Sequence, residues 1–258
     1  DIRALSDDSF EGRGIATPAE DKVVEYLSRE YAAAGFLPGG ENGGWTQDVT
    51  LNRFLASNVQ ASVSVGDWRR DLAQGRDVVV STRLPGTAVN LADAPLVFVG
   101  YGVDAPEQNW NDYAGLDVEG KTVVMLVNDP GFHAKDAQLF EGDRMTYYGR
   151  WTYKFEEAAR KGASAALIIH DTPGASYGWD VVKNSWSGAQ FDLRAEDDPE
   201  PRLPAQGWIS GDVARELFEA AGLDLDAQIA AANLRGFRPV PLKASVSFDL
   251  ASTISEKS

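Results

Sequence analysis

The chain has 258 residues, of which 39 are acidic and 24 are basic, so its formal charge is −15, and hydrophobic residues make up 43% of it. This is the composition of a globular protein whose length allows a substantial core. The excess of carboxylates argues against nucleic acid and against an anionic membrane surface as partners. No apolar run approaches the roughly 20 residues of a membrane-spanning helix. The absence of cysteine excludes thiol catalysis, disulfides and cysteine-ligated zinc.

The first predicted element is a helix over residues 18–34. The run Thr-Pro-Ala-Glu at residues 17–20 combines a capping box with proline at the first helical position. Apolar side chains then recur at helical spacing, and Gly35 is the predicted stop. Because the pattern is amphipathic, the helix needs a surface to pack against. Residues 1–55 contain too few apolar groups to supply one.

Strands dominate the next part of the chain. Residues 36–56 are predicted to be loop and short strand, because glycine pairs interrupt them. Alternating apolar residues then predict a half-buried strand over 59–65. Further strands are predicted at 77–80, 95–99 and 121–127, and the last is a continuous apolar run typical of a strand buried on both faces.

Helices and strands alternate in the second half of the chain. A helix at about 150–161 leads directly into a buried apolar strand at 166–169, which is typical of an α/β unit. Residues 171–206 are predicted to be a long irregular stretch, because they contain four prolines. Two short helices, at about 211–221 and 224–233, precede a closing strand over 242–250. The predicted fold class is therefore mixed α and β.

The chain contains two histidines, His133 and His170, and we consider each as a candidate for catalysis or metal binding. His170 and Asp171 are adjacent at a strand end, where neighbouring side chains point to opposite faces. A catalytic zinc commonly has three protein ligands. We therefore interpret His170 as a strand-end histidine with a local hydrogen bond, and His133 as a surface loop residue. No catalytic or metal-binding residue is assigned. There is no G-x-S-x-G motif for a serine nucleophile and no phosphate-binding loop.

The aromatic-rich segment RMTYYGRWTYKFEEA is the candidate binding surface. Its candidate substrate-binding residues gather at a loop-to-helix junction, and aromatic residues with arginine are typical of recognition surfaces. These residues are Tyr147, Tyr148, Arg150 and Trp151. The alternative is structural: Trp151 and Phe155 belong to the core, and the tyrosines cover an edge. The sequence leaves both interpretations open.

Two segments carry a family resemblance. The stretch LSDDSFEGRGIATPAEDKVVEYLSREYAAAGFLPGG resembles the amino-terminal segment of secreted zinc-dependent aminopeptidases of the aminopeptidase Y and bacterial leucyl aminopeptidase type. The Leu-Ser-x-Asp-x-Phe-x-Gly-Arg motif of those enzymes matches Leu5, Ser6, Asp8, Phe10, Gly12 and Arg13. The later stretch PLVFVGYGVDAPEQNWNDYAGLDVEGKTVVMLVNDPGF is similar to the protease-associated domain inserted in many members, and EEAARKGASAALIIHDTPGASYGW continues that similarity.

The resemblance implies a division of the chain. Residues 1–55 would be the N-terminal segment of the peptidase domain, and 56–243 the inserted protease-associated domain with a β-rich, barrel- or sandwich-like core and flanking helices. Residues 244–258 would be the strand returning to the peptidase domain. The family's metal ligands include an early His-x-Asp, which this sequence lacks, so no ligand is carried over. Two zinc ions are expected in the parent enzyme and no cofactor in this chain. The resemblance also implies a secreted or periplasmic protein.

Three functional hypotheses follow. In the first, the chain is the non-catalytic part of a zinc-dependent aminopeptidase and shapes the access of peptide substrates to a dinuclear zinc site beyond residue 258. Its partners would be the peptide and its own peptidase domain, and Arg150 would pair with a peptide carboxylate. In the second, it is a stand-alone module that binds a peptide or a protein. In the third, it is a complete hydrolase that uses His170, which requires His170→Ala to abolish a measurable activity.

Overall fold

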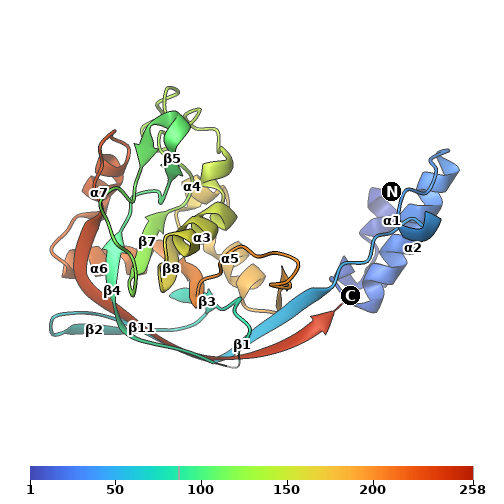
Figure 1. Cartoon of the computed structure of the whole chain (residues 1–258), viewed down its shortest axis with the longest axis horizontal. Helices are drawn as coiled ribbons and strands as arrows, with labels where there is room; N and C mark the ends of the chain where they lie inside the picture. Colours follow the sequence, from blue (N-terminus) through green and yellow to red (C-terminus); the bar gives the residue numbers. More distant parts are fainter. Residues whose placement is uncertain (87, 258) are drawn as a thin grey trace. The chain divides into compact units, whose positions relative to one another are not determined.

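A computed structural model describes residues 1–86 and 88–257 of the chain (Figure 1). It divides the chain into two units, each described separately below. One consists of Asp1–Asn52 together with Ser255–Ser258, and the other of Arg53–Ile254. Two long strands run from one unit into the other, β1 (Leu51–Val65) and β11 (Val240–Lys257).

The Asp1–Asn52 unit is helical. Its elements are α1 (Ile2–Leu5), η1 (Asp8–Arg13), α2 (Pro18–Ala33) and η2 (Glu41–Gly43). Helix α2 is the one predicted from the sequence, and it ends at Ala33 because Gly35 adopts a positive φ of 87°.

The predicted capping box at the start of α2 does not form as expected. The Thr17 hydroxyl donates to the Gly14 carbonyl at 2.7 Å and makes no cap bond to the helix. The Glu20 carboxylate accepts from the Ala16 backbone N–H at 2.6 Å, one residue before the expected partner. These two hydrogen bonds hold the loop before the helix in place. The first backbone N–H groups of α2 receive no side-chain acceptor from Thr17.

Nine strands form the sheet to which the Arg53–Ile254 unit contributes. Their order is β2-β1-β11-β4-β7-β8-β10-β3, and β9 pairs with β1. Besides β1 and β11, the strands are β2 (Trp68–Leu72), β3 (Val78–Ser81), β4 (Ala88–Phe98), β7 (Thr122–Leu126), β8 (Ala165–Ile169), β9 (Gln190–Leu193) and β10 (Ala205–Ile209). A two-stranded sheet of β5 (Asp104–Ala105) and β6 (Trp110–Asn111) flanks η3 (Pro106–Gln108).

The middle of the sheet is parallel and buried on both faces. Strands β4, β7, β8 and β10 run parallel to one another, and every residue of β7, β8 and β10 is buried. One face packs with residues of α3 (Trp151–Arg160) and α5 (Trp179–Trp186). The other packs with α6 (Gly211–Ala220) and α7 (Leu225–Ala232), as Figure 1 shows. The continuous apolar runs of these strands therefore reflect burial on two faces.

These observations confirm the mixed α and β class. The sheet is open, with β2 and β3 at its two ends, and so it does not form the predicted barrel. Two stretches are more regular than predicted. Strand β1 starts at Leu51, inside the stretch predicted as loop and short strand, and continues without a break through the predicted strand at 59–65. Residues 171–206 contain α4 (Thr172–Ala175), α5 and β9. Among the described residues, no helix is long and apolar enough to cross a membrane.

Candidate functional site

The predicted binding residues lie where the short turn η4 (Tyr147–Gly149) leads into α3. Tyr147 is 61% exposed, and its hydroxyl donates to Glu156 Oε2 at 3.1 Å. The Tyr148 hydroxyl donates to Glu107 Oε1 at 2.6 Å, and this bond, together with burial, raises the pKa of Tyr148 to about 12. Both phenols are therefore neutral hydrogen-bond donors to carboxylates at neutral pH.

Arg150 and Trp151 occupy different environments. The guanidinium of Arg150 is exposed and has no hydrogen-bond or ion-pair partner in the described part of the chain. Trp151 is 39% exposed and packs edge-on against Phe155 and Trp186, with ring centroids 6.3 Å and 5.7 Å away. Trp151 thus covers the edge of the core with one part of its ring and leaves the rest accessible.

A cavity of about 220 Å³ lies beside Trp151. Its aromatic walls are Trp151, Phe155 and Phe191, brought together from α3 and β9. Its other lining residues are Arg83, Thr152, Glu156, Asp192, Asp198, Glu200, Pro201, Arg202, Leu203 and Gln206. Tyr147, Tyr148 and Arg150 are not among them. Of the four predicted residues, the structure therefore places only Trp151 at this cavity.

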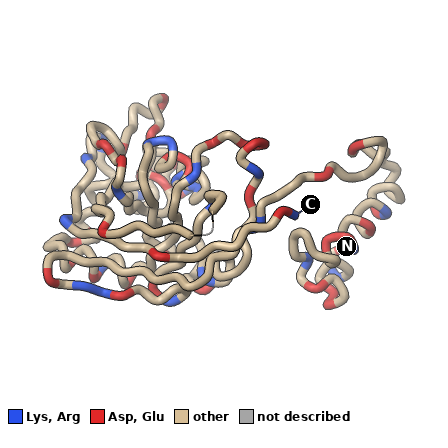
Figure 2. Tube along the Cα trace, turned by 60° about the horizontal axis from the view of Figure 1, so that its bottom comes forward, with Lys and Arg blue, Asp and Glu red and all other residues tan. Residues whose placement is uncertain are grey.

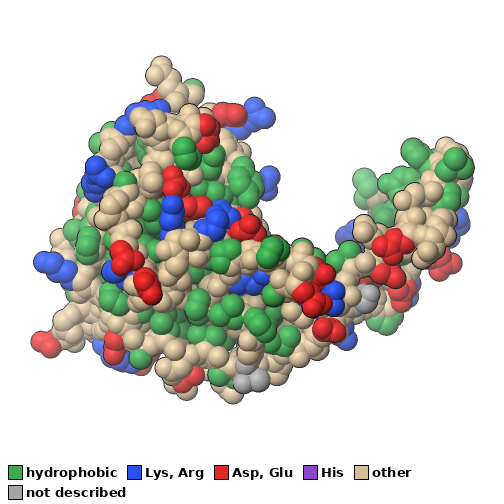
Figure 3. Space-filling model, viewed as in Figure 1, with side chains coloured by type: hydrophobic (Ala, Val, Ile, Leu, Met, Phe, Trp, Pro, Cys, Tyr) green, Lys and Arg blue, Asp and Glu red, His purple; other side chains and the backbone are tan. Residues whose placement is uncertain are grey.

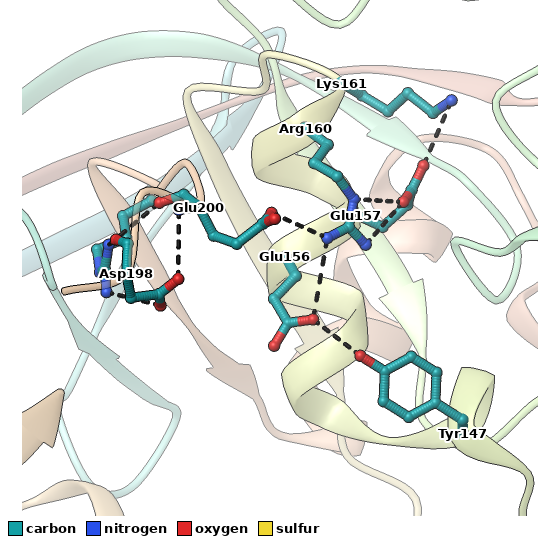
Figure 4. Close-up of polar contacts among 8 residues, drawn as sticks. Tyr147, Glu156, Glu157, Arg160, Lys161, Asp198 and Glu200 are labelled. Carbon is teal, nitrogen blue, oxygen red and sulfur yellow. Dashed lines mark hydrogen bonds and ion pairs between the residues drawn. The ribbon is translucent and has the colours of Figure 1, made fainter. Parts of the chain in front are cut away.

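The acidic side chains around this cavity are already held in ion pairs (Figure 4). The Arg160 guanidinium lies 3.3 Å from Glu200 and 4.0 Å from Glu156. Arg202 donates to Asp192 at 2.9 Å and to Asp198 at 3.0 Å. Oppositely charged side chains also lie next to one another elsewhere on the drawn face of this unit (Figure 3). The exposed pairs contribute little to stability, and two arginines, Arg160 and Arg202, are shared among the four carboxylates of the lining.

Arg83 is the exception among the charged residues of this cavity. It is only 8% exposed, and its Nη2 donates to Gln190 Oε1 at 2.9 Å, while its guanidinium lies 5.6 Å from the ring centre of Trp186. Its Nη1 is buried and has no hydrogen-bond partner. Burial lowers the pKa of Arg83 to about 10, so the side chain still carries its charge at neutral pH.

No local feature of the sequence pointed to Arg83 or Phe191. The Arg83 and Gln190 side chains that meet here are 107 positions apart in the chain. A signal did exist for the region as a whole, since long proline-rich stretches inside a domain are frequently functional. That signal could not identify individual residues, because the strand β9 that carries Phe191 was not predicted.

His170 behaves as predicted. It is buried at the end of β8, and its Nε2 bonds to the Tyr177 carbonyl at 3.0 Å. A carbonyl only accepts, so Nε2 carries the proton of the neutral ring. Burial lowers the pKa of His170, which keeps the ring neutral at physiological pH.

His133 lies in the loop after β7 and is partly exposed, as predicted for a surface loop residue. Its side chain is 22% exposed, and both ring nitrogens are engaged: Nε2 with Asp171 Oδ2 at 2.9 Å and Nδ1 with the Tyr101 hydroxyl at 2.8 Å. The Tyr101 hydroxyl also lies 3.2 Å from Asn233 Oδ1. The sequence did not predict these hydrogen bonds, because Tyr101 and Asp171 are 32 and 38 positions away from His133 in the chain.

Both histidines line a larger cleft of about 920 Å³. It lies at the carboxyl ends of β7, β8 and β10, the edge of an open parallel sheet where ligands commonly bind. Leu126 and Ile169 from the strand ends and Ile229 from α7 contribute apolar lining. Across residues 1–86 and 88–257, however, no three or more His, Asp and Glu residues are grouped as a metal site. We therefore assign no zinc ligand to this chain.

Comparisons with known proteins give a limited result. No protein-family model matches the sequence, and no curated protein matches it. Among solved structures, the chain is similar to an aminopeptidase from Aneurinibacillus sp. strain AM-1. The identity is 19% and the TM-score 0.42, and the match covers 94% of this chain and 41% of that one. This chain thus spans less than half of that structure, and so distant a similarity assigns no activity to it.

Proposed function

We propose that this chain is the non-catalytic part of a zinc-dependent aminopeptidase, and that it controls how peptides reach a catalytic domain outside residues 1–258. The observation that carries the proposal is the cavity beside Trp151, which combines accessible aromatic surface with a buried guanidinium. Concave sites with aromatic walls and a few placed polar groups are typical of ligand recognition. The motifs at residues 5–13 and 96–132 supply the connection to aminopeptidases.

The surface of α2 also supports this proposal. Val24, Leu27 and Tyr31 lie at helical spacing and remain exposed, and Figure 3 shows hydrophobic side chains on the surface of this unit. An apolar stripe of this kind is typical of a surface that packs against another element. In the proposed enzyme, that element is the peptidase domain.

Steady-state kinetics of the full-length enzyme test the access role. Trp151→Ala should raise KM for peptide substrates and leave kcat unchanged, because it removes contact surface and no reacting group. The matched control is Leu234→Ala, which removes an apolar side chain that is more exposed, 64% against 39%, and lies far along the chain. An unchanged KM in Trp151→Ala would contradict a substrate-facing role for this edge.

The proposal that catalysis takes place outside residues 1–258 has its own test. The 258-residue chain should not hydrolyse aminoacyl-anilide substrates with or without added zinc. Zinc-dependent turnover that copurifies with the chain would contradict the proposal and would return attention to His133, His170 and Asp171. The second candidate, a stand-alone peptide-binding module, is favoured instead if peptides bind this chain while Trp151→Ala leaves the kinetics of the full-length enzyme unchanged.

A further inference from the structure

The charge state of the cavity beside Trp151 points to the chemistry of its ligand. Five charged residues other than Arg83 line this cavity, and each has an ion-pair partner: Glu156, Asp192, Asp198, Glu200 and Arg202. Arg83 has none within the described ranges. Its one side-chain hydrogen bond goes to the neutral amide of Gln190. The cavity therefore contains one buried cation that makes no ion pair with the described residues, although the nearby Asp192 carboxylate favours its charged form.

One nitrogen of the Arg83 guanidinium has no hydrogen-bond partner among the described residues. Nη2 is taken by Gln190, and the guanidinium lies over the Trp186 ring at 5.6 Å. Nη1 is buried and unpartnered, and Arg83 is among the lining residues. A buried donor without an acceptor is unfavourable, and a planar guanidinium binds carboxylates especially well. A ligand carboxylate at Nη1 would supply the missing hydrogen-bond acceptor and form an ion pair with Arg83.

We propose that Arg83 binds a carboxylate of the ligand in this cavity, while Trp151, Phe155 and Phe191 hold the apolar part of the same residue. This inference rests on the proposed peptide-binding role of the cavity and specifies its chemistry. The volume of about 220 Å³ lies below the roughly 300–1,000 Å³ of pockets for drug-sized ligands. It suits a single residue, either the C-terminal residue of a peptide or an acidic side chain.

Equilibrium titrations of this chain, followed by the indole signals of Trp151 and Trp186, test the proposal with three probes. N-acetyl-phenylalanine carries a C-terminal carboxylate, N-acetyl-phenylalaninamide carries none, and N-acetyl-glutamic acid amide carries only a side-chain carboxylate. At least one of the two carboxylates should bind about tenfold or more tighter than the neutral amide, as expected for a charge-assisted hydrogen bond. The tighter of the two identifies the source. Equal binding of all three, or no binding at millimolar concentration, would overturn the proposal.

Two arginine variants separate Arg83 from its neighbours. Arg83→Met keeps much of the side-chain volume and removes the donors, so carboxylate binding should weaken about tenfold or more. Arg150→Gln is the matched control, because it removes an exposed arginine close to Trp151 that does not line the cavity. It should bind within about twofold of wild type. The opposite ranking would assign the carboxylate to Arg150.

A stability measurement distinguishes ligand binding from a structural role. Replacing a buried charge that lacks a counter-ion by an apolar side chain is often neutral or stabilising. The melting temperature of Arg83→Met should therefore not fall. A clear fall would show that Arg83 holds the fold together and would overturn the proposal. This experiment is independent of peptidase kinetics: carboxylate binding at Arg83 with an unchanged KM in Trp151→Ala would reject the access role and retain the binding site.

Discussion

Helix α2 in the Asp1–Asn52 unit and helix α6 in the Arg53–Ile254 unit are both amphipathic, but they are buried very differently. Of the 16 residues of α2, only Ala19 is buried. The ten residues of α6 bury Val213, Ala214, Leu217 and Phe218. Both sequences specify a helix with one apolar face, but only α6 packs that face into the core cluster of its own unit. The comparison shows that periodicity predicts the helix, whereas the rest of the chain determines whether its face is covered.

The difference has an energetic consequence. Helices in proteins gain most of their stability from packing of the apolar face, and isolated helices of about 12–15 residues are marginal in water. Helix α6 packs into the cluster that includes Phe98 and Leu96. Helix α2 has small local contacts, such as the edge-on pair Phe10–Tyr26 with ring centroids 6.0 Å apart. Stability should therefore be concentrated in the Arg53–Ile254 unit.

The largest expected effect comes from removing a buried aromatic ring of α6. Phe218 is fully buried, and its ring lies edge-on 5.3 Å from that of Phe98. Phe218→Ala should lower the free energy of unfolding by about 3–5 kcal/mol, because it loses burial and leaves a cavity. Leu27→Ala in α2 removes a side chain that is 36% exposed and should cost less than about 1 kcal/mol.

Urea denaturation of the two variants, followed by tryptophan fluorescence, measures this difference. Six of the seven tryptophans lie in the Arg53–Ile254 unit, so the signal reports mainly on that unit. If Leu27→Ala is as destabilising as Phe218→Ala, then α2 is a packed part of the fold in solution and the contrast between the two helices is lost.

An intermediate effect is expected from the buried carboxylate of Asp77. It accepts hydrogen bonds from the Ala73 backbone N–H at 2.9 Å, from Arg76 at 2.8 Å and from Arg70 at 3.1 Å. These bonds lower the pKa of Asp77, and the hydrogen bond from Arg76 has the largest effect. Asp77→Asn should therefore lower the free energy of unfolding at pH 7 by about 1–3 kcal/mol.

The pH dependence of this loss has a definite sign. Because the pKa of Asp77 is lower in the folded than in the unfolded protein, its contribution is complete above the unfolded value of about 4 and is lost as pH falls through the folded value. The free energies of unfolding of wild type and Asp77→Asn should thus differ at pH 7 and become more similar toward pH 3. Glu11→Gln in the other unit is the control, since Glu11 and Lys22 pair at 2.9 Å with both side chains exposed. It should change stability by less than about 0.5 kcal/mol at either pH. If the free energies of unfolding of Asp77→Asn and wild type differ by the same amount at pH 7 and pH 3, the charge of Asp77 is not the source of the difference.

The sequence predicted the elements whose signals are local. The continuous apolar runs gave the buried strands β7 and β8, and helical spacing with a glycine stop gave α2 and α3. It did not predict β9 or α5, because prolines on either side suggested an irregular stretch. It also did not predict the order of the strands, which depends on pairings between residues far apart in the chain.

The candidate site was less predictable than the fold, because it too depends on contacts between residues far apart in the chain. Trp151 stood out because aromatic residues cluster around it in sequence. Arg83 and Phe191 reach the same cavity from distant segments, and neither has a motif. His133 lies in a loop and is partly exposed, as predicted, but its hydrogen bonds to Tyr101 and Asp171 were not predicted, because both residues are distant in the chain. Acidic and basic residues are interspersed along the chain (Figure 2), so charge patterning did not single out either site.

The smallest effect is expected at the starts of the two helices. The Ser210 side chain accepts from the Val213 backbone N–H at 3.3 Å and so caps α6, whereas the Thr17 side chain makes no cap bond to α2. Ser210→Ala should lower the free energy of unfolding by about 1 kcal/mol. Thr17→Ala should cost less than about 0.5 kcal/mol, since it removes only the bond to the Gly14 carbonyl. Denaturation of both variants under one set of conditions measures the difference. A larger cost for Thr17→Ala would mean that its hydroxyl caps α2 in solution as the capping-box motif predicts, and that the start of this helix contributes to the stability of the whole chain.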